Sequence, residues 1–307
     1  MVGVLQGFAI IGFIIAVGFF VGRFGLLGEH APYVLSRLVF FVLTPSLLFT
    51  ILADADVHAL FSSRLVVSAL AAISCFTVFA LVAALVFRRK LPEVVIGSLA
   101  SGYVNANNIG IPVAAYVIGD ASYSAPVVLV QLLVFAPIAL ALLGGSVSGH
   151  FSVGSVLLQT VRNPLIIASA LGVLVAVSGV SLPSVVLEPF RLLGGAAVGV
   201  LLVNFGMSLS GSRLLEPGTG RRDVVLATVL KLTLMPLVAF TLAHFVFGMM
   251  GHEIFAIVVL AALPTAQNVF NYAQRYERGV VIARDTILLT TVLCIPVLVL
   301  IAFLLKG

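Results

Sequence analysis

The sequence has very few charged residues. Only 9% of its 307 residues are Asp, Glu, Lys or Arg, whereas 62% are hydrophobic and the mean hydropathy is +1.27. A soluble domain carries roughly 25% charged residues, so a soluble fold of this length could not cover its surface. The net charge of +5 is small, and most of it falls on one side of the predicted membrane, so we expect no nucleic-acid partner. The composition indicates a protein embedded in the lipid bilayer.

The sequence also lacks the usual signs of a redox, metal or catalytic centre. Its two cysteines, Cys75 and Cys294, lie inside apolar runs, where we expect ordinary buried thiols. It contains no HExxH motif, no paired aspartates within an apolar run, and no serine and histidine at a shared depth. An intramembrane enzyme is therefore not indicated, and we expect neither a cofactor nor a metal site.

Ten apolar runs are candidates for membrane-spanning helices. Most reach about 20 residues, which suits a hydrocarbon core of roughly 30 Å. The longest polar break, residues 144–163, falls midway and predicts a linker between two five-helix halves, residues 1–143 and 164–307. The ten runs are Val4–Val21, Leu35–Leu52, Leu65–Phe87, Val94–Ile118, Ala125–Leu143, Leu165–Val180, Leu192–Leu209, Val224–Phe247, Ile254–Tyr272 and Ile287–Leu305.

Lysine and arginine are distributed unevenly between the loops. Twelve of them follow odd-numbered runs, and three follow even-numbered runs or lie at the C-terminus. The positive-inside rule then places the odd loops in the cytoplasm and both termini outside it, as expected for a multi-pass protein of the plasma (inner) membrane. Because each half has an odd number of runs, the second half is predicted to be inverted relative to the first.

A polar tetrapeptide interrupts an apolar run in each half. Asn105-Ala106-Asn107-Asn108 and Thr265-Ala266-Gln267-Asn268 align on a shift of 160 residues, and a proline lies close to each. Polar groups and helix breakers at membrane depth are costly unless they line a cavity or are buried in protein. Two of them at matching positions predict broken helices at the binding site of a transporter. The residues expected at this site are Asn105, Asn107, Asn108, Pro112, Pro264, Thr265, Gln267 and Asn268.

The unwound segments favour a negatively charged substrate. The N-terminal ends of half-helices attract anions, and asparagine and glutamine add amide donors without a buried charge. The alternative is structural, because proline and glycine are common in membrane helices and amide side chains can join neighbouring helices. The symmetric occurrence of the two motifs favours the binding site.

These residues resemble a known family. Asn107-Asn108-Ile109-Gly110-Ile111-Pro112 and Leu263-Pro264-Thr265-Ala266-Gln267-Asn268 are similar to the crossover motifs of the auxin efflux carrier family, and the resemblance covers essentially the whole chain. It implies an all-α membrane protein of ten helices in two inverted repeats, whose fourth and ninth helices are broken and cross. It also implies a scaffold domain of helices 1, 2, 6 and 7, a mobile domain of the other six, elevator-type alternating access and a homodimer. The implied substrate is an organic anion such as a small carboxylate, contacted by Asn108 and Asn268.

Three further groups of polar residues each have two possible roles. Gln131, a lone amide in the fifth run, projects into the same cavity or bonds to a neighbouring helix. Lys231 lies about 12 Å into the eighth run, where a lysine costs about 2.5 kcal/mol or more. Its charge either balances an anionic substrate or makes structural ion-pair or carbonyl contacts. Asp54, Asp56 and Asp285 are candidates for proton coupling or gating, although we expect them to be solvated surface charges.

A sodium-coupled symporter of the bile acid:sodium symporter type is the alternative function, since that fold is related. Sodium sites need several converging oxygens and usually a carboxylate. The ninth run offers Thr265, Gln267 and Asn268 but no Asp or Glu. The sequence therefore predicts a secondary transporter of a small organic anion.

Overall fold

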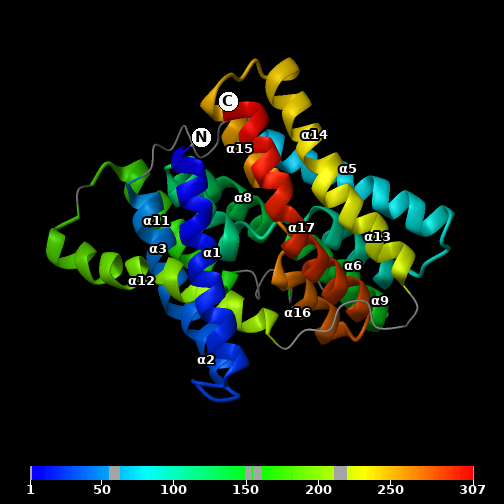
Figure 1. Ribbon diagram of the computed structural model, residues 1–307, viewed down its shortest axis with the longest axis horizontal. Coiled ribbons are helices and arrows are strands. Elements are labelled where there is room, and N and C mark those ends of the chain that lie inside the picture. Colours follow the sequence, from blue (N-terminus) through cyan, green and yellow to red (C-terminus); the bar gives the residue numbers. More distant parts are fainter. Residues whose placement is uncertain are drawn as a thin grey trace.

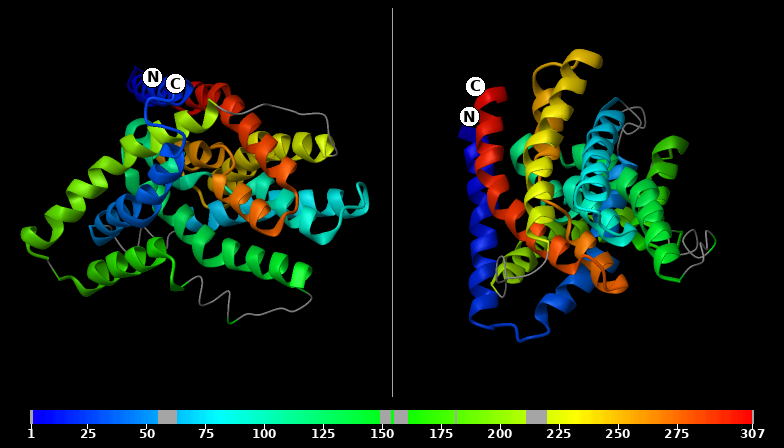
Figure 2. Two further views of the ribbon diagram at one scale, coloured as in Figure 1. Left: turned by 90° about the horizontal axis from the view of Figure 1, so that it is seen from below. Right: turned by 90° about the vertical axis from the view of Figure 1, so that its right-hand side faces the viewer.

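The computed structural model describes residues 2–54, 63–148, 154, 161–180, 182–210 and 220–306 (Figure 1). These residues are helical, with a single isolated β-bridge and no strand among them. The two ends of the chain lie close together in every view (Figures 1 and 2).

The first half of the chain contains five apolar helical segments, several of them interrupted by a wider π-helical turn. The first segment is α1 (Val2–Arg23), and the second consists of α2 (Ala31–Leu38), a π turn (Val39–Leu43) and α3 (Thr44–Ala53). The third is α5 (Ser63–Leu85), and the fourth consists of α6 (Leu91–Gly102), a π turn (Ala106–Gly110), α7 (Ile111–Val113) and a π turn (Ala114–Ile118). The fifth consists of a 3₁₀ turn (Ala121–Ser124), α8 (Ala125–Val130), a π turn (Gln131–Phe135) and α9 (Ala136–Ser148).

The second half also contains five apolar helical segments among its described residues. Its elements are α11 (Pro164–Ser178), α12 (Ser184–Leu209), α13 (Arg221–Val229), a π turn (Leu230–Leu234), α14 (Met235–Thr241) and a π turn (Leu242–Val246), followed by α15 (His252–Ala261), α16 (Gln267–Tyr276) and α17 (Val280–Lys306).

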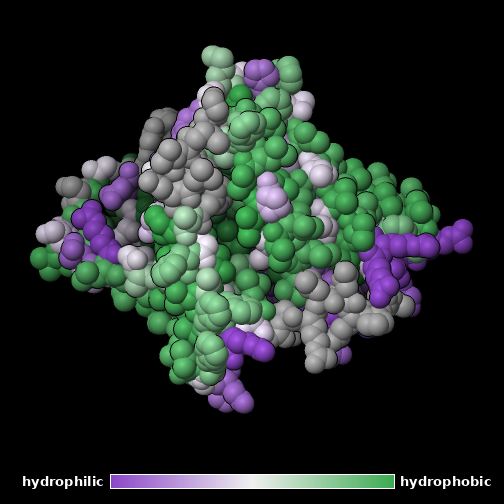
Figure 3. Space-filling view, in the orientation of Figure 1, coloured by the Kyte–Doolittle hydropathy of each residue, from purple (hydrophilic) through white to green (hydrophobic). Residues whose placement is uncertain are grey.

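Six helical stretches among the described residues are long and apolar enough to cross a membrane. They carry large apolar side chains on the outside, for example Leu85 and Phe303, and the face seen in Figure 3 is mostly apolar with hydrophilic residues at its rim. Such a surface needs lipid rather than water around it. The six stretches are Ala31–Ala53, Ser63–Leu85, Ala121–Ser146, Ser184–Met207, Arg221–Val246 and Val280–Leu305.

Three predicted boundaries are wrong, each because hydropathy alone does not mark a helix end. Helix α12 begins at Ser184 rather than Leu192, with Pro189 inside it, since the polar residues of its first turns lower the hydropathy but not the helicity. Helix α17 begins at Val280 rather than Ile287. Helix α9 continues to Ser148, so the first five residues of the predicted linker are helical, and most of the remainder lies outside the described residues.

The helices pack into two groups, which we call the α12 group and the α6 group. In the α12 group, α1 packs against α12, and α3 packs against α11 and α12. In the α6 group, α5 and α13 pack against α6, α17 packs against α13 and α15, and α14 packs against α5 and α15. Figure 1 shows α3, α11 and α12 on the left and α5, α6 and α13 on the right.

Glycines bring α1 and α12 into backbone contact. A Cβ atom on Gly18 would collide with the carbonyl of Val203, and one on Gly206 would collide with the carbonyl of Ile15. Small residues allow this close approach where helices associate within lipid. The contact fixes α12 firmly against α1, and α12 forms one wall of the site described next.

Candidate functional site

The two helix interruptions lie side by side in the α6 group. Helix α6 ends at Gly102 and α15 at Ala261, within the runs where the polar tetrapeptides predicted breaks. Val104 and Thr265 then form an antiparallel β-bridge. The amide of Asn105 donates to the Pro264 carbonyl at 2.8 Å, and the amide of Ala266 donates to the Tyr103 carbonyl at 3.0 Å. Each unwound segment thus satisfies the backbone groups of the other, as non-helical backbone at membrane depth requires.

Buried hydroxyl groups hold this crossing in place. Thr265 Oγ1 donates to the Ala100 carbonyl at 2.6 Å, and the Thr265 amide donates to Thr290 Oγ1 at 3.1 Å. On the other segment, Ser124 Oγ donates to the Ala106 carbonyl at 2.8 Å. These bonds connect α6, the 3₁₀ turn before α8, and α17 to the two broken segments.

Asn105 starts the helical turn after the first break. Its Oδ1 accepts from the backbone amide of Asn108 at 3.1 Å, which is the usual role of asparagine at a helix N-terminus. Asn105 and Thr265 are almost completely buried, and neither lines the large cavity beside the crossing. Pro112 and Pro264 also lie outside its lining. The structure therefore places Asn105, Pro264 and Thr265 within the crossing itself and Pro112 in α7 (Ile111–Val113), which follows it.

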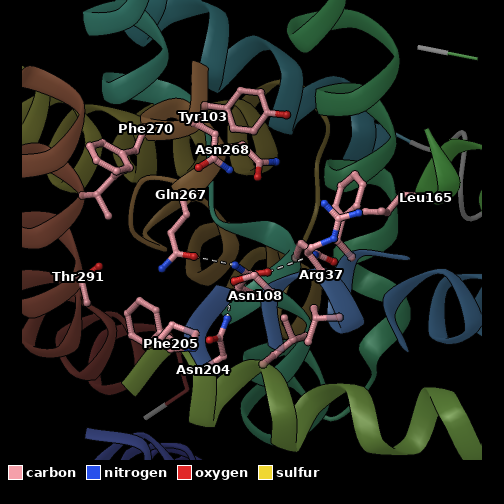
Figure 4. Close-up of a pocket in the computed structure, with 18 of the residues that line it drawn as sticks. Arg37, Tyr103, Asn108, Leu165, Asn204, Phe205, Gln267, Asn268, Phe270 and Thr291 are labelled. Carbon is pink, nitrogen blue, oxygen red and sulfur yellow. Dashed lines mark hydrogen bonds between the residues drawn. The ribbon is translucent and has the colours of Figure 1, made fainter. Parts of the chain in front are cut away.

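A cavity of about 960 Å³ opens beside the crossing. The other five amide residues predicted for the site, Asn107, Asn108, Gln131, Gln267 and Asn268, all line it. Asn107 Nδ2 donates to Asn108 Oδ1 at 3.1 Å, and Asn108 Nδ2 donates to Gln267 Oε1 at 3.3 Å. Figure 4 shows this Asn108–Gln267 bond, which joins the two broken segments at the cavity wall. The structure thus brings the predicted amide residues of the two broken segments to one cavity, together with Gln131 from the π turn after α8.

Two arginines that sequence reasoning missed also line the cavity. Arg37, from α2, donates to the Tyr33 hydroxyl at 3.2 Å and lies 5.0 Å from the centre of the Phe41 ring. Arg284, from α17, donates through Nε to Asp285 Oδ1 at 2.7 Å. From their positions after odd-numbered runs, both were expected to be cytoplasmic loop charges. The signal for Arg284 was the adjacent Arg-Asp pair ahead of an apolar run, whereas nothing in the sequence marked Arg37.

The lining is suited to an anion with an apolar portion. No Asp or Glu is among the described residues that line the cavity, whereas two arginines and seven amide side chains are. Phenylalanine, leucine and valine side chains cover much of the remaining wall. Arginine and amide N–H groups are the usual partners of a carboxylate, and a largely apolar pocket with a few polar groups is typical of small-molecule sites.

The cavity lies between the two groups of helices. The α12 group and the adjoining α2 contribute Arg37, Leu165, Asn204 and Phe205 among others, and the α6 group contributes the amide cluster. In the view of Figure 4, α12 with Asn204 and Phe205 forms one wall below Asn108. A relative movement of the two groups would therefore change access to the cavity.

The four charged residues with open interpretations differ in their surroundings. Lys231 is fully buried and does not line the cavity; its Nζ donates to the Ala261 carbonyl at 2.6 Å. The structure thus supports carbonyl contacts for Lys231 rather than direct contact with a substrate. Asp285 is 1% exposed and paired with Arg284, so its prediction as a solvated surface charge is wrong: α17 starts earlier than predicted and carries it into the protein. Asp54 is exposed, 3.6 Å from Arg191, and Asp56 lies outside the described residues.

Comparison with known proteins supports this reading of the fold. The sequence model of the family described as membrane transport protein matches residues 4–143 and 147–302. The chain belongs to this family, the auxin efflux carrier family. Among its relatives is the uncharacterized transporter MJ1031 of Methanocaldococcus jannaschii, which is 25% identical over 297 residues, 94% of each chain. The uncharacterized transporter YfdV of Escherichia coli K12 is 26% identical over 273 residues, 86% of this chain and 85% of its own.

Membership in this family establishes the general nature of the protein. It is a multi-pass membrane protein of a transporter family, since the match spans almost the whole chain and the relatives are named transporters. The family and the relatives indicate transport rather than the catalysis of a reaction.

Proposed function

We propose that this member of the auxin efflux carrier family is a secondary transporter of a small organic anion, a mono- or dicarboxylate, bound beside the helix crossing. The observation that carries the proposal is the cavity lining, in which two arginines and seven amide side chains occur without an acidic residue among the described positions. Because Arg284 is paired with Asp285, the net positive charge of the lining comes from Arg37, and this charge favours anions over cations. Asn108 and Asn268, on the two broken segments, are the proposed partners of the carboxylate.

The proposed mechanism is elevator-type alternating access. The mobile domain would comprise the third to fifth and eighth to tenth spans and carry the crossing, and the scaffold domain would comprise the other four. The packing of α1, α3, α11 and α12 on one side of the cavity supports this division. Because the crossing is held by bonds within the α6 group, it would move with that group as one body, and Arg37 on α2 would meet the substrate in only one position.

The remaining parts of the proposal concern the arrangement in the membrane. We propose ten spanning helices in two inverted repeats, residues 1–143 and 164–307, with both termini outside the cytoplasm of the plasma (inner) membrane and two copies associated as a homodimer. The proximity of the chain ends (Figures 1 and 2) supports an even number of crossings. Labelling of single cysteines at the two ends and in the loop before α6, in intact and in permeabilised cells, tests the orientation.

The decisive experiment is transport by purified protein in proteoliposomes. Malonate, succinate, lactate and indole-3-acetate would be offered singly, with amino acids and bile salts as comparison substrates. Charge movement and radiotracer counterflow together detect both electrogenic and electroneutral transport. Transport of a carboxylate, lost on replacing Asn108 with alanine, supports the proposal; transport of amino acids alone would contradict it.

The same assay distinguishes the alternative, a sodium-coupled symporter of the bile acid:sodium symporter type. Each substrate would be measured with sodium and with choline as the external cation. Uptake of bile salts that requires sodium would favour the symporter. Uptake of a carboxylate that is equal in both media would favour the proposed function.

A further inference from the structure

Lys231 is the one lysine that the described part of the structure buries completely, and the proposed anion site does not account for it. It lies in the π turn between α13 and α14 and has no exposed surface. None of the ion pairs among the described residues includes it. A buried ammonium without a counter-ion is strongly unfavourable unless other polar groups replace its water, so its contacts must explain why it is there.

The main contact of Lys231 is a carbonyl that the helix break has set free. In a continuous helix the Ala261 carbonyl would accept the amide of residue 265, four positions on. The Thr265 amide instead donates to Thr290 Oγ1, and Pro264 has no amide hydrogen to offer. Lys231 Nζ donates to this Ala261 carbonyl at 2.6 Å and lies 3.3 Å from the sulfur of Met235. The ammonium therefore caps the C-terminal end of α15, where the helix dipole is negative.

The other groups around Lys231 are weakly polar and carry no formal charge. The Cys75 thiol, from α5, donates to the carbonyl of the neighbouring Leu230 at 3.6 Å. Helix α17, which packs against the π turn of Lys231, carries a second buried thiol, Cys294. The positive charge is thus balanced by the end of a helix and not by an acidic side chain.

In transporters with broken helices, freed carbonyls and the C-terminal ends of half-helices coordinate the coupling cation. We propose that Lys231 is a tethered substitute for that cation: its ammonium occupies the end of α15 permanently, and anion transport therefore needs no sodium. Lys231 acts as a positioning residue, because it holds the end of α15 from which the segment of Gln267 and Asn268 continues, and it does not touch the substrate. This inference rests on the proposed anion transport for its functional consequence, but not for its structural one.

Comparison of the two halves of the sequence supports a role for Lys231 that is specific to the second half. The shift of 160 residues that aligns the two polar motifs also places Lys231 on Ala71. Ala71 is a fully buried alanine of α5. The position of the first half that aligns with Lys231 therefore carries no cation.

The test replaces the tethered cation with a free one. Purified wild-type protein, Lys231→Ala and Lys231→Met would be melted in detergent in choline, sodium or methylammonium chloride at equal ionic strength, and assayed for uptake in the same salts. Lys90→Ala, which removes an exposed lysine, is the matched control. Methionine has a similar length without the charge, so Lys231→Met keeps the core filled and is expected to fold.

The proposal makes a distinct prediction for each protein. Wild type and Lys90→Ala melt at the same temperature and transport equally well in all three salts. Lys231→Ala shows a saturable rise in Tm, by about 2 °C or more, as methylammonium or sodium fills the vacated space, and recovers part of its lost uptake. Lys231→Met folds, loses at least about tenfold in uptake, equivalent to 1.4 kcal/mol, and responds to no cation.

Three results would overturn the inference. One is a wild-type protein whose Tm and uptake rise with sodium relative to choline, because a separate cation site would then exist. Another is Lys231→Met with wild-type uptake, because the charge would then be dispensable. The third is Lys231→Ala that no cation stabilises. If the wild type transports none of the carboxylates, the proposed function fails, whereas the melting experiment still decides the role of Lys231.

Discussion

Replacing Asn108 by aspartate and by alanine tests the sign of the charge on the substrate. The side chain of Asn108 lies at the cavity wall and bridges the two broken segments through Gln267. Its backbone amide, which Asn105 caps, is retained in both variants. Neither change therefore disturbs the start of the helical turn. Aspartate keeps the shape of asparagine and adds a negative charge, whereas alanine removes the amide group.

The expected magnitudes separate the two variants clearly. Alanine removes a hydrogen bond to a charged group, which is worth about 1.5 to 3 kcal/mol, or about 10- to 150-fold in affinity. Aspartate adds a negative charge at about 4 Å from a bound carboxylate. With an effective dielectric constant of about 20, the repulsion is about 4 kcal/mol, or about 1,000-fold. For an anionic substrate, aspartate must therefore be more harmful than alanine.

Affinity would be measured from the concentration dependence of uptake and of the ligand-induced rise in Tm. Asn163→Asp is the matched control, because Asn163 caps α11 outside the cavity and aspartate caps a helix equally well. An Asn108→Asp protein that folds and binds its substrate as well as Asn108→Ala does, or better, would refute the reasoning that the site binds an anion.

Three further predictions follow from other contacts. Thr265→Val removes the buried bond to the end of α6 and should lower the free energy of unfolding by about 1 to 3 kcal/mol, seen as a lower Tm in detergent. Thr233 is exposed and its hydroxyl bonds to Val229 within its own turn, so Thr233→Val should leave Tm unchanged. Arg89→Ala breaks a two-bond ion pair with fully buried Asp223. It should lower the free energy of unfolding by about 2 to 3 kcal/mol, less than for a fully buried pair because the arginine is 32% exposed. Adding Asp223→Asn should restore part of the lost stability, and equal Tm values for wild type, the single variant and the double variant would contradict the role of the pair. Arg37→Gln should weaken anion binding about fivefold, since the side chain is exposed and screened, and should flatten the salt dependence of uptake; unchanged affinity would place the substrate away from α2.

The sequence marked the amide residues of the two breaks because their signal is local. Asn107, Asn108, Gln267 and Asn268 stand out as polar residues inside apolar runs, and the proline beside each motif marks the break. Gln131 was a weaker prediction, made from one amide in an apolar run, and the structure places it in the same cavity wall. Residues on the broken segments can therefore be recognised from the local sequence alone.

Other residues of the site could not be predicted because their roles depend on contacts between distant segments. Asn105 and Thr265 have the same composition signal as their neighbours, yet their side chains turn to the protein interior and hold the crossing. Arg37 and Arg284 looked like loop charges until the positions of α2 and α17 brought both to one cavity. Which way a polar side chain points is decided by the helix packed against it.

The sequence by itself determined that this protein is embedded in a membrane. It also determined the positions at which the helices are interrupted and the polar character of these interruptions. Those properties follow from hydrophobic run length, the scarcity of charge and the missing amide of proline, each of which acts within a few residues. Only the tertiary structure decided that the two interruptions pair with each other and that arginines from α2 and α17 face the amide cluster. It also decided that Lys231 meets the carbonyl freed at Ala261. These features arise from segments more than a hundred residues apart, or from different helices, that unsatisfied backbone groups and close packing bring together.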